Sequence, residues 1–154
     1  MISMGNGLRT LNIASLNPDP MRETATQQEI VKGMTKNKIH IASVQETHMT
    51  QDDSYMLDNY RITASSDKSE ETGVVAWGTA IVIHESLHHH ITQITRQRIR
   101  SLRVSLDHAK SKMPIRVIST YSPRNGHAEG ERRHRRGDVK AILRKTRTRR
   151  RVIW

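Results

Sequence analysis

The alternation of apolar and polar residues predicts a strand, a helix and a second strand in the first third of the chain. Residues 8–16 alternate, with Leu11 and Ile13 on the same side, as in a half-buried strand. Residues 39–44 are apolar on both faces, which is typical of a central strand. Between them, residues 19–37 begin with Asp-Pro and carry an apolar stripe at helical spacing. This order favours a parallel crossover unit.

The rest of the pattern predicts a series of neighbouring strands and then a basic helix. Residues 50–72 are polar and are interpreted as a loop with a short strand at 60–63. Further strands are expected at residues 79–83, 99–106, 115–121 and 152–154. Residues 127–146 have helical spacing, with an apolar side that faces inward. Because several strands follow one another directly, antiparallel pairing is favoured there.

The composition indicates a small core and an intracellular protein. Hydrophobic residues make up 34% of the chain and Phe is absent, against roughly 45–50% apolar residues in an average soluble domain. There is no Cys, which excludes disulfides and thiolate metal sites. The nucleus is one candidate compartment. No apolar run approaches the roughly 20 residues of a membrane-spanning helix, so a membrane partner is not expected.

The positive charge is concentrated near the C-terminal end of the sequence. The net charge is +11, which favours polyanionic partners, and nucleic acid first among them. Residues 124–151 contain twelve Lys or Arg and three acidic residues, which is +9 of that total. A solvated basic face and a nucleic-acid contact are equally good interpretations of this segment.

Glu46 and Asn12 are the first candidates for chemistry. Glu46 follows the apolar strand 39–44, and ligands of open α/β sheets bind at that end of a strand. One carboxylate there suits Mg²⁺, which commonly leaves other positions to water and phosphate. The alternative is an ordinary surface glutamate at the start of a loop. The Asn12 amide could hold a phosphate oxygen or orient a carboxylate, or it could cap a turn.

Three further residues are placed where they could contact a phosphate. Tyr121 ends a predicted strand, and its hydroxyl could reach a phosphate or pack at the sheet rim. Arg98 and Arg100 lie on one strand face, where they could be phosphate contacts or solvated side chains.

The histidine triplet at residues 88–90 is interpreted as hairpin surface rather than a metal site. On a strand, His88 and His90 would share one face. No carboxylate or further histidine stands at a supporting spacing, except His84.

Taken together, five blocks of the sequence resemble the endonuclease/exonuclease/phosphatase superfamily. They are residues 11–17 (LNIASLN), 45–48 (QETH), 78–83 (GTAIVI), 98–104 (RIRSLRV) and 118–123 (ISTYSP). The likeness is nearest to the apurinic-type endonuclease domain of non-LTR (LINE-type) retrotransposons and runs over residues 8–154. It implies an α+β sandwich of four layers, with mixed, mostly antiparallel sheets and flanking helices.

The resemblance also implies roles for individual residues. Glu46 would bind Mg²⁺, with Mn²⁺ as an alternative, Asn12 would orient the phosphate and the catalytic carboxylate, and Tyr121 would contact the phosphate. DNA would be the partner. Relatives have an Asn directly after the Tyr-x-Pro motif, whereas here Arg124 stands there and Asn125 comes one residue later. These two residues would join Arg98 and Arg100 in binding nucleic acid.

The sequence departs from this family by lacking two of its blocks. Neither Gly-Asp-x-Asn, which supplies the Asp that activates water, nor Ser-Asp-His occurs in these residues. We therefore expect residues 1–154 to be one partial domain, with a basic helical segment at 127–151. The apolar face of the first sheet would then lie uncovered, and nuclease activity would be near background. A truncated, degenerate copy or a gene-prediction artefact would explain such a chain.

Two other functions are compatible with the sequence. One is a non-catalytic nucleic-acid-binding module that acts through the basic C-terminal segment. The other is a phosphatase or phosphodiesterase that acts on lipid or small phosphoesters, because the shared motifs do not determine the substrate. The oligomeric state is not predicted.

Overall fold

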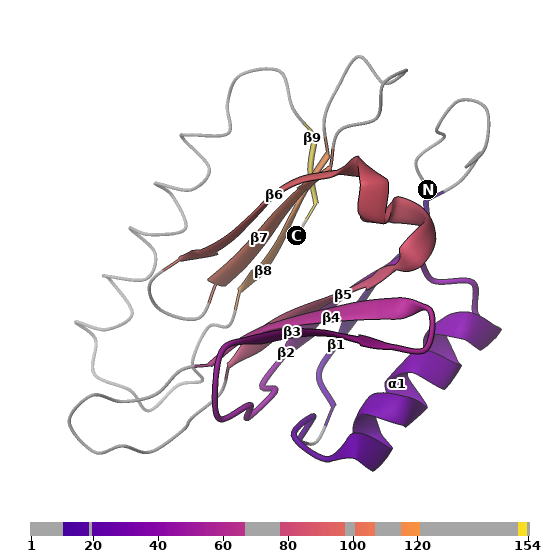
Figure 1. The fold of residues 1–154 in the computed structure, drawn as a ribbon, viewed down its shortest axis with the longest axis vertical. Coiled ribbons are helices and arrows are strands. Elements are labelled where there is room, and N and C mark those ends of the chain that lie inside the picture. The colour runs from indigo at the N-terminus through magenta and orange to yellow at the C-terminus, as the bar shows by residue number, and fades with distance from the viewer. Residues whose placement is uncertain are drawn as a thin grey trace.

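The described part of the chain forms two facing β-sheets with one helix on the outer side of the first sheet (Figure 1). A computed structural model describes residues 11–18, 20–66, 78–97, 101–106, 115–120 and 151–153. The first sheet contains β1 (Ile13–Leu16), β2 (Ile41–Gln45), β3 (Asp53–Leu57), β4 (Tyr60–Ser65) and β5 (Thr79–His84). The second contains β6 (Ile91–Gln97), β7 (Ser101–Leu106), β8 (Ile115–Thr120) and β9 (Arg151–Ile153).

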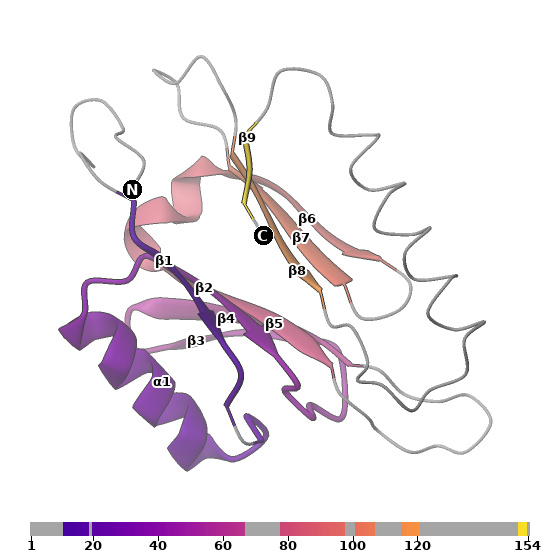
Figure 2. The ribbon, with the colours of Figure 1, turned by 180° about the vertical axis from the view of Figure 1, so that it is seen from behind.

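The strand order places the ends of β1 and β2 at the same edge of the first sheet. That sheet has the order β1-β2-β5-β4-β3, and β1 and β2 are parallel neighbours with Leu16 opposite Val44. Figure 2 shows these two strands running side by side. The pairs β2–β5, β5–β4 and β4–β3 are antiparallel. The second sheet has the order β6-β7-β8-β9, with a parallel β8–β9 pair. The mixed, mostly antiparallel arrangement and the β1-α1-β2 crossover are confirmed.

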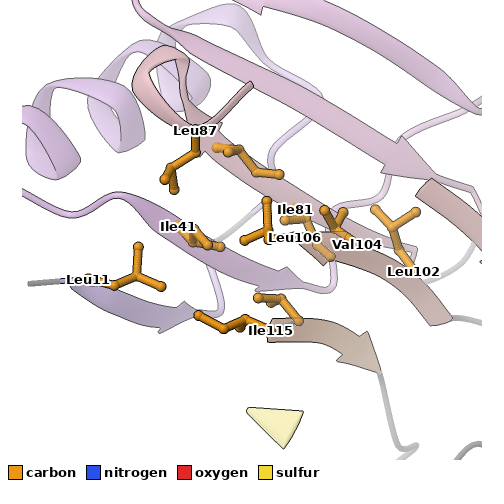
Figure 3. Packing of buried hydrophobic residues seen from close by; sticks show 10 residues of the cluster. Leu11, Ile41, Ile81, Leu87, Leu102, Val104, Leu106 and Ile115 are labelled. Carbon is orange, nitrogen blue, oxygen red and sulfur yellow. The ribbon is translucent and has the colours of Figure 1, made fainter. Parts of the chain in front are cut away.

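The inner face of the first sheet is covered by the second sheet, so the prediction that this face would be bare is wrong. Ten buried residues fill the space between the sheets (Figure 3): Leu11, Ile41, Ile81, Ile83, Leu87, Leu102, Val104, Leu106, Ile115 and Val117. Aliphatic side chains alone make this core, and β6, β7 and β8 supply its second side. Burial of these side chains is the main stabilising contribution to the sandwich.

Helix α1 (Thr24–Lys36) packs on the outer face of the first sheet through Val31 and Met34. It begins later than predicted, with Glu23 as an N-cap whose side chain makes no capping hydrogen bond. The buried Gln27 instead donates its amide hydrogen to the Met21 carbonyl, at 2.9 Å. The predicted cap, Asp19, lies outside the described residues. The predicted end at residue 37 is confirmed, because Asn37 is the C-cap.

The structure differs from the predicted elements at three places between residues 50 and 97, although the short strand expected at 60–63 is present in β4 (Tyr60–Ser65). The polar stretch 50–72 contains the β3–β4 hairpin, whose two-residue turn uses left-handed Asp58. Strand β6 was not predicted, because a register shift near Gln93 interrupts its alternation. Residues 88–90 belong to the 3-10 helix η1 (Glu85–His90) rather than to a strand.

Part of the sequence interpretation falls outside the described residues. The basic helix expected at 127–146 is not among them, and of the segment 127–151 only the backbone of Arg151 is described, in β9. Among the described helices, none has both the length and the apolar character that crossing a bilayer requires.

Candidate functional site

The candidate site is the edge of the sandwich at which β1 and β2 end. Glu46 directly follows β2, and Asn17 directly follows β1. Because Leu16 is paired with Val44 in parallel register, the next residues, Asn17 and Gln45, are neighbours at this edge. Strand β5 begins here, since Thr79 pairs with Gln45.

The second sheet reaches the same edge through Ser119 of β8. Its hydroxyl, fully buried, donates a hydrogen bond of 3.1 Å to the Val44 carbonyl of β2. This bond links the two sheets two residues before Glu46. The C-terminal end of β8 therefore lies beside the C-terminal end of β2.

Glu46 itself has an unusual backbone and a carboxylate that remains available. Its φ is +54°, in the left-handed region that non-glycine residues seldom adopt. The side chain is partly exposed, and among the described residues none makes a hydrogen bond or an ion pair with it. A carboxylate in this situation can accept an external ligand at little structural cost.

The residues after Glu46 are held against the start of β5. Thr47 is fully buried, and its N–H donates to the Gly78 carbonyl at 3.3 Å. His48 again has a positive φ, of +53°. The buried Thr47, which is bonded to Gly78, therefore stands between two residues with a left-handed backbone, Glu46 and His48.

Asn12 does not lie beside Glu46. Its side-chain amide donates to the Lys38 carbonyl at 2.9 Å, and its backbone N–H donates to Nδ1 of His40 at 3.1 Å. These contacts place Asn12 at the N-terminal end of β2. Glu46 comes six positions after His40 in the sequence, which is roughly 20 Å along a strand. The structure therefore does not bring these two predicted residues together.

The amide at the same edge as Glu46 belongs to Asn17. Asn17 is exposed, and no described residue makes a hydrogen bond with its side chain. Its position was visible in the sequence, since Leu16-Asn17 marks the end of an apolar strand just as Val44-Gln45-Glu46 does. Asn17 directly follows the predicted strand 8–16, but no role at the site was predicted for it.

The edge is polar where the two sheets face each other. The Ser15 hydroxyl donates to Oε1 of Gln45 at 3.3 Å, and Nε2 of Gln45 donates to the Ser43 hydroxyl at 2.7 Å. Ser43 and Gln45 lie on the same face of β2 as Ile41 of the inter-sheet core. The core thus changes from aliphatic to hydroxyl-lined on approaching Glu46.

The remaining predicted site residues lie outside the described residues. They are Tyr121, Arg98, Arg100, Arg124 and Asn125. Their roles stay predictions.

Two of the described histidines, His40 and His84, lie at the opposite end of the first sheet from Glu46. His40 and His84 rings are 6.4 Å apart, and the Tyr60 ring lies 5.0 Å from His84. Burial, and then the nearby His84, lower the pKa of His40. Within the described residues, no group of three or more His, Cys, Asp or Glu could hold a metal ion.

The oxygen donors at the Glu46 edge suit a hard divalent cation. Glu46 provides one carboxylate and Asn17 one amide oxygen. Mg²⁺ is commonly held by one or two carboxylates, with water and phosphate oxygens in the other positions. Glu46 would be the protein's charged ligand, and Asn17 a neutral neighbour.

The comparisons with known proteins agree with this architecture. No family model and no curated protein matches the sequence. Among solved structures, the endonuclease domain of TRAS1, a telomere-specific non-LTR retrotransposon, is similar with a TM-score of 0.58 and 16% identity. The match covers 93% of this chain and 57% of that one. An AP endonuclease from Archaeoglobus fulgidus is similar with a TM-score of 0.56 and 19% identity, over 87% of this chain and 49% of that one.

These similarities identify the fold. The chain shares the fold of these two endonucleases, which is the fold that the resemblance of its sequence motifs implied. It spans about half the length of the solved structures that it matches.

Proposed function

We propose that this chain is part of a divalent-metal-dependent DNA endonuclease domain of the retrotransposon type, with Glu46 as the metal ligand. The observation that carries the proposal is the Glu46 carboxylate, which is partly exposed and has no described protein partner at the edge where β1 and β2 end. The similarity to two endonucleases supports hydrolysis of a phosphodiester in DNA over the other phosphoesters considered above.

The residues at this edge suit the binding of a phosphate beside a metal ion. A bound Mg²⁺ would stabilise negative charge on the phosphate and on the leaving 3′ oxygen. Glu46 would hold that ion, and the Asn17 amide would donate to a phosphate oxygen. Asn17 thereby takes over the role that the sequence suggested for Asn12. Mg²⁺ is the proposed ion, and Mn²⁺ is a practical substitute in experiments.

The first experiment measures Mn²⁺ binding to the full 154-residue chain by paramagnetic broadening of backbone amide signals. We expect selective broadening at residues 45–48, and a Glu46→Gln variant should bind at least about tenfold more weakly, because it loses the charged ligand. Gln keeps the size of the side chain, so the fold should persist. Equal Mn²⁺ affinity in both proteins would overturn the assignment of Glu46.

The second experiment tests the reaction by plasmid nicking in Mg²⁺, with Glu46→Gln and EDTA as controls. These residues contain neither the Gly-Asp-x-Asn nor the Ser-Asp-His block, so we expect nicking near background from this chain. Nicking that disappears in both controls would support the endonuclease directly and contradict the expected inactivity. Nicking that persists in Glu46→Gln would overturn the proposed site.

A non-catalytic nucleic-acid-binding module is the second candidate, because of the net +9 between residues 124 and 151. Its DNA affinity would fall steeply with salt and would not change in Glu46→Gln or on addition of EDTA. The endonuclease site predicts a component of DNA binding that requires both Glu46 and the metal ion.

A further inference from the structure

The backbone of Glu46 lies in a conformation that its own sequence does not favour. Four described non-glycine residues have positive φ angles: Lys38, Glu46, His48 and Asp58. Lys38 follows the C-cap of α1, and Asp58 lies in the two-residue turn of the β3–β4 hairpin. Left-handed residues are ordinary at both of those places. Glu46 and His48 follow a strand and flank a buried residue, so their conformation needs another cause.

The cause lies in the contact between Thr47 and Gly78. Thr47 is fully buried, and its N–H donates to the Gly78 carbonyl at 3.3 Å. This bond extends the β2–β5 ladder past its last pair, Gln45 and Thr79. Thr47 is thereby fixed to β5, and Glu46 must turn between two anchored neighbours.

Gly78 fits this contact only because it has no side chain. A Cβ at Gly78 would lie 2.6 Å from the Thr47 hydroxyl oxygen, 3.1 Å from the Ser65 carbonyl oxygen and 3.8 Å from the His48 backbone nitrogen. The φ of Gly78 is +62°, which adds a second reason for glycine. Thr47 and the His48 backbone nitrogen therefore pack directly against the Gly78 backbone.

We infer that Gly78 and Thr47 are positioning residues that set the backbone of Glu46 for metal binding. Strained residues persist where the surrounding structure over-determines them, and they are found at functional sites. Here the surroundings are a hydrogen bond to Gly78, a close approach that excludes a Cβ, and the end of β4 at Ser65. This inference rests on the proposed function, since it assumes that Glu46 binds the metal.

The test introduces a methyl group at Gly78 and measures Mn²⁺ affinity by paramagnetic broadening on the full chain. Gly78→Ala should move Thr47 and weaken Mn²⁺ binding about tenfold, the lower range for loss of a supporting group. The matched control is Gly33→Ala in α1, because a Cβ there meets nothing within 4 Å. It should leave the affinity unchanged. Equal affinity in the Gly78→Ala chain and the unsubstituted protein would overturn the inference.

A double variant separates positioning from general loss of structure. In Thr47→Ala/Gly78→Ala the oxygen that the new methyl group meets at 2.6 Å is gone. The Gly78→Ala substitution should then weaken Mn²⁺ binding less than it does beside an intact Thr47. Equal weakening in both backgrounds would show that Thr47 does not transmit the effect.

Two further variants keep the result decisive. If Gly78→Ala does not fold, Thr47→Ser takes its place, because it keeps the hydroxyl and loses the methyl group that restricts its rotamer. We expect about threefold weaker Mn²⁺ binding with unchanged circular dichroism; unchanged affinity would contradict the inference. Glu46→Gln distinguishes the two proposals. If this variant binds Mn²⁺ normally, Glu46 is not the metal ligand and the proposed function fails. If Glu46→Gln loses Mn²⁺ binding while Gly78→Ala binds normally, only the positioning role of Gly78 and Thr47 is refuted.

Discussion

The two ends of the parallel β1–β2 pair use their polar side chains in opposite ways. At the N-terminal end, polar groups of Asn12, His40 and Tyr60 all bond to the backbone. The Asn12 amide donates to the Lys38 carbonyl, Nδ1 of His40 accepts from the Asn12 N–H, and the Tyr60 hydroxyl donates to the Ile39 carbonyl at 3.1 Å. At this end of the sheet, these polar side chains are therefore engaged in hydrogen bonds within the protein.

At the C-terminal end, the side chains of Glu46 and Asn17 are left available for a ligand. Among the described residues, none hydrogen-bonds to the side chain of Glu46 or Asn17. The backbone of Glu46 is left-handed, and the next residue, Thr47, is anchored by its bond to the Gly78 carbonyl. A polar group that bonds to the backbone stabilises the fold, whereas one that stays solvated can exchange water for a ligand. The comparison teaches that, on these two strands, stability and binding depend on different ends.

The largest expected effect concerns the buried hydrogen bond between Ser119 and Val44 at the C-terminal end. Ser119→Ala removes the hydroxyl that donates to the Val44 carbonyl across the sheets. The lost bond and the gap it leaves should reduce the free energy of unfolding by about 1–3 kcal/mol. Urea denaturation measures this change. The control, Ser15→Ala, alters an exposed hydroxyl on the same edge and should change stability by less than about 0.5 kcal/mol. A Ser119 effect no larger than that of the control would show that the cross-sheet bond contributes nothing.

A paired asparagine exchange tests the comparison directly. Asn12→Ala removes the bond to the Lys38 carbonyl and should lower the free energy of unfolding by about 1 kcal/mol, without any effect on Mn²⁺ binding. Asn17→Ala should change stability by less than about 0.5 kcal/mol and weaken Mn²⁺-dependent DNA binding. Urea denaturation and DNA titrations in Mn²⁺ measure the two properties. If Asn12→Ala rather than Asn17→Ala weakened DNA binding, the N-terminal end of the β1–β2 pair would be the binding end. Asn12 would then be the phosphate-orienting residue, as the sequence predicted.

The sequence was sufficient for elements in which the local pattern and the tertiary contacts agree. Strand β5 has a continuous apolar run, and the crossover from β1 through α1 to β2 follows from the order of the elements. Strand β6 was missed for a physical reason: Ile91 and Ile94 both pack against the inter-sheet core, at a spacing that a bulge produces and simple alternation excludes.

The site was predictable only in part, because its geometry depends on which strand ends meet. Glu46 could be found, since it directly follows an apolar strand. Asn12 could not be placed from the sequence alone: the structure puts it beside Lys38 and His40, before β1 begins at Ile13, and its role stays a prediction. The contribution of Gly78 could not be predicted, since it arises from contacts with Thr47 and Ser65, residues distant in sequence.

The smallest expected effect is a pH dependence of the free energy of unfolding, which originates at the N-terminal end of β2. Burial, followed by repulsion from His84, lowers the pKa of His40, and its Nδ1 must be unprotonated to accept the Asn12 N–H. Folding therefore favours neutral His40. Its contribution to stability is fully present above the unfolded pKa of about 6.5 and is lost as the pH falls below that value. Urea denaturation between pH 7.5 and 5.5 should show a decreasing free energy of unfolding.

The matched variant for this prediction is His40→Asn. The Asn side-chain oxygen can accept the Asn12 N–H in place of Nδ1 and does not titrate in this range. His84 remains, and its ring still lies 5.0 Å from the Tyr60 ring. The stability of His40→Asn should therefore fall less between pH 7.5 and 5.5 than that of the unsubstituted chain. An identical pH profile would assign the dependence to other histidines. Mn²⁺ affinity should be the same in both proteins at pH 7.5, since His40 lies at the far end of β2 from Glu46.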